Sequence, residues 1–496
     1  SEMCIRDRHK DNSKMDSKIK REKTKIVATL GPSTSNYEMI SQLVEAGASM
    51  FRLNTSHGTE EGHAANIEII RKISQETGKY IPILIDLQGP KIRVGNIPNP
   101  IEIKEGQEII LEATDEVNNP DILPVDYEGI ADDVKSGDKI LLDDGNIGLV
   151  VTGVSNHQVH AKVLYGKLIK PRKGINLPGA TASLSAVTER DVEYIRFAVE
   201  YDADYVALSF VREAKDIELA KKYIKDYGGN IPVIAKIEKP QAVENLEEIL
   251  KVTDGIMVAR GDLGIEMSPE EVPIVQKYIV DQTIRERKVC IVATQMLESM
   301  IENPIPTRAE ASDVANAILD GTDAIMLSGE TAMGKHPVEA VKMMRKIATN
   351  VEDCNFCLSN LDLEMNDKYD LSPQAISNAA VKMAQDLNAK AILAFTHTGY
   401  TPKLLSKLRP TVPVIAISDM ESTCRRLSLY WDIVADYKQW DTVLDADLLE
   451  KIDEYILTRT DYKKGERIII IGSIPKLITG RTNFIRVHRI GAPMER

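Results

Sequence analysis

Eight short apolar runs alternate with helical patterns along this chain, and this alternation constrains the fold more than any other feature. The runs are residues 25–30, 50–54, 81–86, 205–209, 232–237, 255–259, 289–294 and 323–327. Apolar runs of this length between amphipathic helices are typical of buried parallel strands. Eight successive strand and helix pairs predict a (β/α)8 barrel, here formed by residues 23–89 and 183–361.

Polar side chains collect where these runs end, which is where (β/α)8 barrels place their chemistry. They are Arg52, Asn54 and Ser56 after the second run, Asp86 after the third, Lys236 and Glu238 after the fifth, Gly261 and Asp262 after the sixth, and Thr294 after the seventh. Residues two apart on a strand share a face, so the Lys236 ammonium and the Glu238 carboxylate can point into one site. Such a pair can hold an anion and the cation that neutralises it, which indicates metal-assisted phosphoryl chemistry.

Residues 90–182 separate the third and fourth runs and are far longer than an ordinary loop of the barrel. Short strand patterns at 101–103, 108–112, 139–142, 148–152 and 157–162, with turns such as Asp144-Gly145, predict a small β-barrel domain. Because this domain would be attached at the catalytic rim, we expect it to close as a lid that excludes water.

A second α/β unit is predicted over residues 371–496, after a charged, turn-rich boundary. Its strand-like runs at 391–396, 414–417 and 467–471 predict an open, largely parallel sheet. Thr396, Thr398, Gly399 and Thr401 follow the first of these runs. Their turn could hold a phosphate at a helix start, and an ordinary capped strand-to-helix turn would account equally well for the same residues.

The charge and composition of the chain argue against several classes of function. The chain has 496 residues and a net charge of -13, so its overall field does not attract nucleic acid or an anionic membrane. No apolar run approaches the ~20 residues that span a bilayer, and the polar residues 1–22 predict a mobile tail without signal-peptide features. The five cysteines are scattered, as in a reducing compartment. We therefore expect a cytoplasmic protein.

Eight motifs in order give the chain a specific resemblance to the pyruvate kinase family from about residue 23 to residue 490. The motifs are TKIVATLGPST (24–34), FRLNTSHG (51–58), IDLQGPKIRVG (85–95), KGINLPG (173–179), IAKIEKP (234–240), MVARGDLGIE (257–266), ATQMLESM (293–300) and MLSGETAMGKHP (326–337). The resemblance implies a barrel A domain, an inserted B domain, a C-terminal effector domain and a homotetramer. It implies transfer of a phosphoryl group from phosphoenolpyruvate to ADP, giving pyruvate and ATP in the last step of glycolysis.

The resemblance also implies roles for the polar residues at the strand ends. Glu238 and Asp262 would bind Mg2+, for which Mn2+ can substitute, since carboxylate oxygens suit this ion. Lys236 would neutralise the transferred phosphoryl group and the enolate, and Arg52 would bind phosphate. The backbone donors of Gly261 and Asp262 would hold the substrate carboxylate, and Thr294 would lie near the carbon that is protonated. A threonine hydroxyl is a weak acid, so a water relay is the favoured route.

Nucleotide and K+ positions follow from the same motifs. The nucleotide residues implied are Asn54, Thr55, Ser56, His57, Arg93 and Lys173. The K+ ligands implied are Asn54, Ser56, Asp86 and the carbonyl of Leu87. Many family members carry glutamate where this chain has Lys91, and Leu87, Gln88, Lys91 and Val94 together resemble the K+-independent pattern. A tethered ammonium can supply the charge that K+ brings. We therefore expect K+ independence; if Lys91 points into solvent, K+ still binds.

Regulation and two other functions complete the interpretation. The turn at Thr396, Thr398, Gly399 and Thr401 would be an allosteric cradle for a sugar phosphate or a nucleotide monophosphate, although it lacks lysine and arginine. A lyase of phosphoenolpyruvate or pyruvate would not need the inserted domain with Arg93 and Lys173. A silent sensor, meaning a metabolite-sensing or scaffold protein without catalytic activity, would be expected to have lost some of the catalytic residues. This chain retains all four of them: Lys236, Glu238, Asp262 and Thr294.

Overall fold

The computed structural model describes residues 21–114, 122–179, 184–354, 363, 365–366, 370–440, 446–473 and 482–492. They belong to two compact units. The first unit, the barrel unit, combines Thr24–Ile67 with Pro82–Leu358. The second unit, the C-terminal unit, combines Ser1–Lys23, Glu68–Ile81 and Ser359–Arg496. The predicted tail over 1–22 lies almost entirely outside the described residues.

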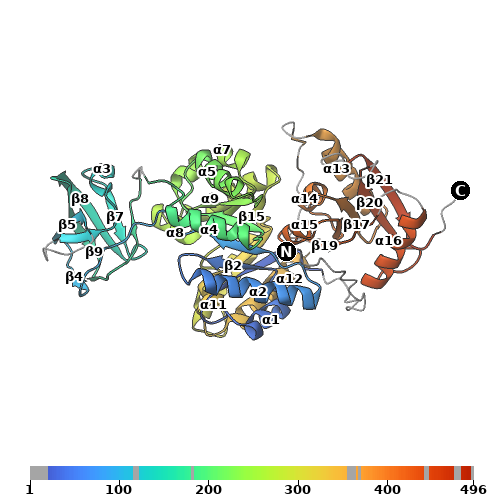
Figure 1. The fold of residues 1–496 in the computed structure, drawn as a ribbon, viewed down its shortest axis with the longest axis horizontal. Helices are drawn as coiled ribbons and strands as arrows, with labels where there is room; N and C mark the ends of the chain where they lie inside the picture. Colours follow the sequence, from blue (N-terminus) through green and yellow to red (C-terminus); the bar gives the residue numbers. More distant parts are fainter. Residues whose placement is uncertain are drawn as a thin grey trace, which may run out of the picture. The chain divides into compact units, whose positions relative to one another are not determined.

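A closed barrel of eight parallel strands forms the core of the barrel unit (Figure 1). Its strands are β1 (Lys25–Leu30), β2 (Met50–Asn54), β3 (Ile83–Asp86), β12 (Tyr205–Leu208), β13 (Val233–Ile237), β14 (Gly255–Ala259), β15 (Val289–Ala293) and β16 (Ala324–Leu327). The order around the barrel is β1-β16-β15-β14-β13-β12-β3-β2. Each barrel strand therefore lies beside the barrel strand that comes next in the chain, and the last, β16, pairs with the first, β1. The predicted (β/α)8 barrel is confirmed.

Helices follow the barrel strands along the chain. They are α1 (Tyr37–Ala46), α2 (Glu60–Thr77), α4 (Glu189–Glu200), α5 (Ala214–Asp226), α6 (Pro240–Glu244), α7 (Leu246–Val252), α8 (Arg260–Glu266), α9 (Val272–Arg285), η1 (Glu298–Ile301), α10 (Arg308–Leu319), α11 (Gly329–Ala332) and α12 (Pro337–Glu352). Thr188 and Thr307 form capping boxes at the starts of α4 and α10. These boxes satisfy amide groups that have no partner within the helix, and so mark where the helix begins.

Three aspartates join neighbouring strands at the amino-terminal end of the barrel. A carboxylate oxygen of Asp204 accepts a hydrogen bond from the Ile83 amide at 2.9 Å. Asp254 accepts one from Val233 at 2.9 Å, and Asp323 accepts one from Cys290 at 2.8 Å. Each aspartate just precedes a strand, so the contact links that strand to its neighbour. These residues stabilise the barrel at the end opposite the functional rim.

The inserted segment folds mainly into a six-stranded sheet with the order β11-β7-β8-β9-β5-β6. Its elements are β4 (Ile101–Glu102), β5 (Glu108–Ala113), β6 (Ile122–Val125), α3 (Ile130–Asp133), β7 (Lys139–Leu142), β8 (Ile147–Ser155), β9 (Gln158–Tyr165), β10 (Leu168–Ile169) and β11 (Ile175–Asn176). Isolated bridges join Val94 to Val125 and Arg93 to Gly174, beside the two edges of the sheet. Residues 93–94 therefore complete the barrel-like closure around the segment's own apolar core.

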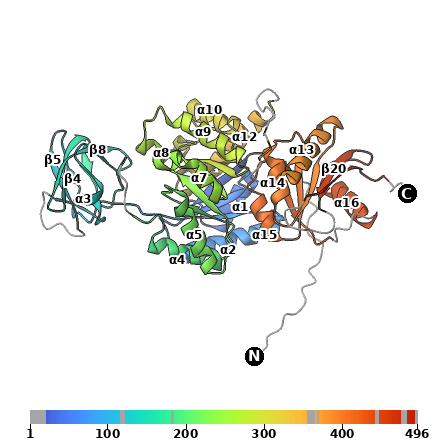
Figure 2. The same cartoon turned by 90° about the horizontal axis from the view of Figure 1, so that it is seen from above.

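The C-terminal unit contains a five-stranded sheet with the order β19-β18-β17-β20-β21 (Figure 2). Its elements are α13 (Leu371–Asp386), β17 (Ile392–Thr396), α14 (Tyr400–Lys407), β18 (Val414–Ser418), α15 (Glu421–Leu427), β19 (Ile433–Tyr437), α16 (Ala446–Arg459), β20 (Arg467–Gly472) and β21 (Phe484–Arg489). All neighbours are parallel except β20 and β21, which agrees with the predicted open, largely parallel sheet.

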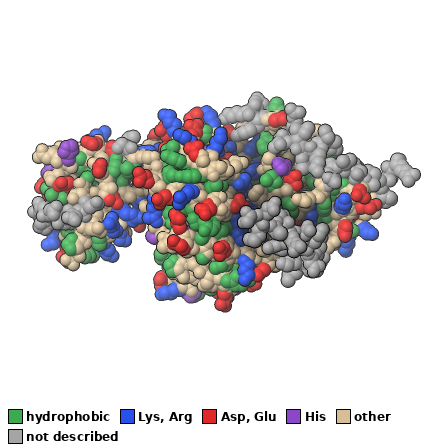
Figure 3. Space-filling view, in the orientation of Figure 1, with side chains coloured by type: hydrophobic (Ala, Val, Ile, Leu, Met, Phe, Trp, Pro, Cys, Tyr) green, Lys and Arg blue, Asp and Glu red, His purple; other side chains and the backbone are tan. Residues whose placement is uncertain are grey.

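Acidic and basic side chains are interspersed over the face of the molecule shown in Figure 3. They do not gather there into one large patch of a single sign, which a polyanion-binding face would require. In the described part of the chain, no helix combines the length and the apolar character of a bilayer-spanning segment.

Candidate active site

Four charged side chains of alternating sign form a buried row at the carboxyl ends of β2, β3 and β13. Arg52 Nε lies 2.6 Å from Asp86 Oδ2. Lys236 Nζ lies 3.3 Å from Asp86 Oδ1 and 2.8 Å from Glu238 Oε1. The side chains of Arg52 and Lys236 are each 11% exposed, and those of Asp86 and Glu238 are 1% and 2% exposed. The strand ends therefore bring the predicted cations and carboxylates together out of water.

Neutral groups fix the two cations of this row in place. Arg52 Nη1 donates to Thr29 Oγ1 at 3.0 Å, and Lys236 Nζ donates to Ser209 Oγ at 2.7 Å. Ser209 Oγ in turn donates to the carbonyl of Leu87 at 2.7 Å. The sequence analysis did not assign a role to Thr29 or Ser209. Ser209 is the polar last residue of a predicted strand, a signal that could have identified it.

The pKa values of the row follow from burial and from neighbouring charge. Burial lowers the pKa of Lys236, but Asp86 and Glu238 outweigh this effect and hold the pKa above its ordinary value. Burial raises the pKa of Asp86, but Lys236 and Arg52 outweigh it and hold that pKa below the ordinary value. Lys236 and Asp86 are therefore both charged at neutral pH.

Glu238 and Asp262 provide carboxylates suited to a divalent cation. Burial raises the pKa of Glu238, Lys236 opposes this, and the negative charge of Asp262 raises the pKa further. Glu238 Oε2 also accepts the Phe210 amide at 2.8 Å, which orients the group. A cation between the two carboxylates would relieve their repulsion. Among the described residues, no cluster of three or more acidic, histidine or cysteine side chains forms a complete metal cage. Such a site suits Mg2+, which keeps water and substrate oxygens among its ligands.

Thr294 follows β15 in a left-handed backbone conformation with a φ of 68°. Its hydroxyl accepts the Gly261 amide at 2.7 Å and donates to the Ala293 carbonyl at 2.6 Å. Thr294 and Gly261, both predicted substrate residues, are therefore in direct contact. The Gly261 amide, expected to hold a substrate carboxylate, is bonded to the threonine hydroxyl in this structure.

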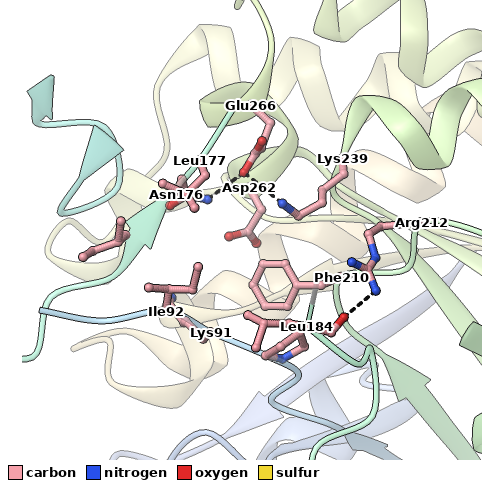
Figure 4. Close-up of a pocket in the computed structure, with 12 residues that line it drawn as sticks. Lys91, Ile92, Asn176, Leu177, Leu184, Phe210, Arg212, Lys239, Asp262 and Glu266 are labelled. Carbon is pink, nitrogen blue, oxygen red and sulfur yellow. Dashed lines mark hydrogen bonds and ion pairs between the residues drawn. The ribbon is translucent and has the colours of Figure 1, made fainter. Parts of the chain in front are cut away.

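A pocket lies beside Asp262, between α8 and the inserted segment (Figure 4). Asp262 and Glu266 come from α8, and Lys239 follows β13. Glu266 Oε1 accepts from Asn176 Nδ2 at 3.0 Å and lies 3.6 Å from Lys239 Nζ. The remaining lining residues are Pro90, Lys91, Ile92, Ile175, Leu177, Leu184, Phe210 and Arg212. The pocket thus combines apolar walls with charges of both signs next to the predicted metal carboxylates.

The residues predicted to contact nucleotide are divided between the barrel rim and the inserted segment. Asn54 Oδ1 accepts the Ser56 amide at 3.2 Å, and Thr55 Oγ1 donates to the Asp86 carbonyl at 2.9 Å. Burial, and then the charges of Arg93, Lys91 and Arg52, lower the pKa of His57. The positive charges of Arg93, Lys91 and Arg52 are thus felt at His57 and disfavour its protonation.

On the inserted segment, Arg93 Nη1 donates to the Arg172 carbonyl at 3.2 Å. Lys173 Nζ lies 2.6 Å from Asp143 Oδ1. Lys173 is thus held by a carboxylate of its own segment, with 41% of its side chain exposed.

Protein groups already contact two of the predicted K+ ligands, Asp86 and Leu87. Arg52 and Lys236 pair with the two oxygens of Asp86, and Ser209 donates to the Leu87 carbonyl. Lys91 lines the same pocket as Asp262, and its Cε would lie 2.9 Å from a Cβ placed on Gly174. The Lys91 side chain therefore runs along the backbone of the inserted segment at the pocket.

In the C-terminal unit, the turn predicted to bind an effector is closed by its own hydrogen bonds. Thr396 Oγ1 accepts the Gly399 amide at 2.9 Å, and the Thr401 hydroxyl pairs with that of Thr482. Gly399 has a φ of 84°, which favours glycine. These contacts close the turn before α14, whose N-cap residue Gly399 offers no side-chain cap. Two of the predicted phosphate-binding hydroxyls thus already have protein partners.

Comparisons with known proteins agree with this geometry. The family described as pyruvate kinase, barrel domain, matches residues 21–341, and pyruvate kinase, alpha/beta domain, matches residues 374–488. A pyruvate kinase of Sporosarcina psychrophila is 43% identical over 474 residues, covering 95% of this chain and 80% of that protein. One of Mycobacterium intracellulare is 43% identical over 468 residues, covering 94% and 98%. The crystal structure of a pyruvate kinase from Cryptosporidium parvum has a TM-score of 0.86 at 33% identity, covering 94% of this chain and 96% of that one. The chain therefore belongs to the pyruvate kinase family and is a phosphotransferase.

Proposed function

We propose that this protein transfers the phosphoryl group of phosphoenolpyruvate to ADP, giving pyruvate and ATP. The observation that carries the proposal is the buried row of Arg52, Asp86, Lys236 and Glu238. Phosphoryl transfer mainly requires positioning and stabilisation of spread negative charge, and two fixed cations away from water provide both.

The reaction consists of two coupled changes. The bond between phosphorus and the enol oxygen breaks, and a β-phosphate oxygen of ADP forms the new bond to phosphorus. The enolate that remains takes one proton at its methylene carbon and becomes pyruvate. Lys236, held charged by its two carboxylates, stabilises the phosphoryl group and then the enolate oxygen. Arg52 holds phosphate oxygens, and Thr294 directs the water that delivers the proton.

The remaining residues hold the reactants. Glu238 and Asp262 would bind Mg2+, which supplies charge neutralisation to the phosphate oxygens when it is bound. Asn54, Thr55, Ser56, His57, Arg93 and Lys173 contact the nucleotide. Residues 90–182 act as a separate lid domain over the barrel of residues 23–89 and 183–361, and exclude water when they close.

Lys91 replaces the monovalent cation in this proposal. Its side chain runs along the pocket beside Asp262, and its charge reaches His57. A tethered ammonium here supplies positive charge to the phosphates without K+. The positions Asn54, Ser56, Asp86 and Leu87 then need no ion, which agrees with the protein partners that Asp86 and Leu87 already have.

Allosteric control in a homotetramer is also proposed, with residues 371–496 as the effector domain. Support comes from the hydroxyl-rich turn at Thr396, Thr398, Gly399 and Thr401. A sugar phosphate or nucleotide monophosphate would have to compete with the internal bonds of Thr396 and Thr401.

The decisive assay couples pyruvate formation to lactate dehydrogenase, with phosphoenolpyruvate, ADP and Mg2+ in K+-free buffer and again with added K+. Equal activity in both supports the reaction and the role of Lys91. Activity only with K+ keeps the reaction and overturns the role of Lys91. No activity in either buffer overturns the proposed function and favours the silent sensor.

A further inference from the structure

Arg260 is an almost buried arginine that no step described above uses. It is the first residue of α8, directly before Gly261, and its side chain is 10% exposed. Its Nη1 lies 2.7 Å from Asp313 Oδ1 on α10 and 3.4 Å from Gln276 Oε1 on α9. A guanidinium fixed in this way has a set direction for its other donors.

Those other donors reach the backbone around Thr294. Nη2 donates to the carbonyl of Thr294 at 2.8 Å and to that of Gln295 at 3.4 Å. Nε donates to the carbonyl of Ala293 at 3.4 Å, and Nη2 also contacts Met296 Sδ at 2.7 Å. One side chain therefore bonds to four consecutive residues, from Ala293 at the end of β15 to Met296.

The backbone that Arg260 holds is strained. Thr294 and Gln295 have φ values of 68° and 53°. The left-handed region is unfavourable for a β-branched residue such as threonine. Residues in such conformations persist where their surroundings determine them strongly, and they concentrate at functional sites. The hydrogen bonds from Arg260 to three successive carbonyls hold the backbone of Thr294 and Gln295 in this conformation.

Arg260 and Gly261 thus hold Thr294 from two sides. The Gly261 amide donates to the Thr294 hydroxyl at 2.7 Å, while Arg260 donates to the Thr294 carbonyl. We propose that Arg260 is a positioning residue for the proton-transfer step, because it fixes the strained backbone that aims the Thr294 hydroxyl. The inference rests on the proposed function and assigns a residue to its second half, the conversion of enolate to pyruvate.

The two halves of the reaction can be measured separately. Phosphoryl transfer is followed as ATP formed in a single turnover by rapid quench, with phosphoenolpyruvate, ADP and Mg2+. Proton transfer is followed in reverse, as loss of deuterium from trideuterated pyruvate by NMR, with Mg2+ and inorganic phosphate. In that exchange a methyl C–D bond breaks, its electron pair forms the enolate and its deuteron passes to water; a solvent proton then returns to the carbon. Misplacing Thr294 slows the exchange and leaves the Lys236 row intact.

The variants are R260M, R260K and a matched control, R285M. Arg285 pairs with Asp281 at 2.8 Å on α9, and its side chain is 55% exposed. In R260M we expect deuterium exchange to fall by about 10²-fold, as for a misplacement of about 1 Å. ATP formation should stay within about threefold, by the same argument of local misplacement. R260K should recover part of the exchange, because an ammonium can still bond to one carbonyl. R285M should match the wild type in both measurements.

A merely structural role gives a different result. If exchange and ATP formation fall in parallel in R260M, or if neither changes, the proposal is overturned. If R260M does not fold by near-UV circular dichroism, D313N decides, because it keeps the guanidinium and weakens its anchor. A selective fall in exchange in D313N supports the proposal, and an unchanged ratio of exchange to ATP formation overturns it. A wild-type protein that forms no ATP overturns the proposed function itself, and with it the step that Arg260 would serve.

Discussion

Lys236 and Glu238 stand two residues apart at the end of β13, with their ammonium and carboxylate groups 2.8 Å apart. Both side chains point into the same site because alternate residues of a strand share a face. Burial of such an ion pair is unfavourable unless further hydrogen bonds and charges satisfy the remaining donors and acceptors of both groups. Lys236 also pairs with Asp86 and donates a hydrogen bond to Ser209, and Glu238 accepts a hydrogen bond from the Phe210 amide. The pair is therefore the organising contact of the site.

Replacement of Lys236 by methionine should abolish phosphoryl transfer, with a loss of at least about 10³-fold. The physical reason is the loss of the one ammonium between Asp86 and Glu238. Steady-state kinetics and far-UV circular dichroism check that activity falls while the fold remains. Lys251→Met is the control, since Lys251 pairs with Glu248 on the exposed surface of α7. Appreciable activity in Lys236→Met would rule out the assigned role.

Divalent metal binding should weaken at a higher pH than an ordinary carboxylate site would show. Burial and the charge of Asp262 raise the pKa of Glu238 above 4.5. As the pH falls through this raised pKa, Glu238 gains a proton and loses its affinity for the cation. Mn2+ binding followed by electron paramagnetic resonance from pH 8 downward measures the effect. Glu238→Gln should bind Mn2+ weakly at every pH, and unchanged binding in that variant would contradict Glu238 as a ligand.

Replacement of Asp86 by asparagine should destabilise the barrel unit by about 3–5 kcal/mol at pH 7, because it removes the carboxylate paired with the buried Arg52 and leaves Lys236 with Glu238 alone. The pKa of Asp86 is held below its ordinary value of 3.8, so its stabilising charge is fully present above that pH. The contribution is lost as the pH falls through the lowered pKa. Urea unfolding at several pH values should therefore show the difference between the two proteins shrinking only in acid.

Asp281→Asn is the control for this measurement, since Asp281 pairs with Arg285 on the exposed face of α9. An exposed pair contributes about 0–1 kcal/mol. Equal destabilisation in the two variants would contradict the claim that the buried charge of Asp86 stabilises the fold more than an exposed ion pair does.

The barrel could be predicted from the sequence because its strands are continuous apolar runs, buried on both faces. In β15, for example, all five residues from Val289 to Ala293 are completely buried. The prediction missed strands with weaker patterns. β6 contains Pro124, and β21 is an edge strand with polar residues such as Arg486 and His488. Each of these strands stands at an end of the strand order of its sheet, where residue preferences depend on the surroundings more than on a local pattern.

The same division holds in the site. Lys236 and Glu238 could be predicted because strand alternation alone places them together. The roles of Thr29, Ser209 and Arg260 depend on contacts between neighbouring barrel strands or the residues that follow them, 23 to 36 positions apart in the chain. An arginine at a helix start gives no local sign that it will be buried. The strain at Thr294 is likewise a property of the folded backbone.

Replacement of Lys91 by glutamate should convert the enzyme to K+ dependence. In the wild type, the Lys91 side chain runs along the pocket beside Asp262 and supplies positive charge near His57. A glutamate there adds a negative charge, so a monovalent cation becomes necessary to balance the phosphates. We expect turnover in K+-free buffer to fall by about 10²-fold, the effect of losing one preorganised charge contact, and added K+ to restore most of it. Lys91→Gln separates loss of the ammonium from gain of a carboxylate and should give an intermediate response to K+. Turnover of Lys91→Glu that is independent of K+ would show that Lys91 does not replace the ion, whatever the activity of the wild type.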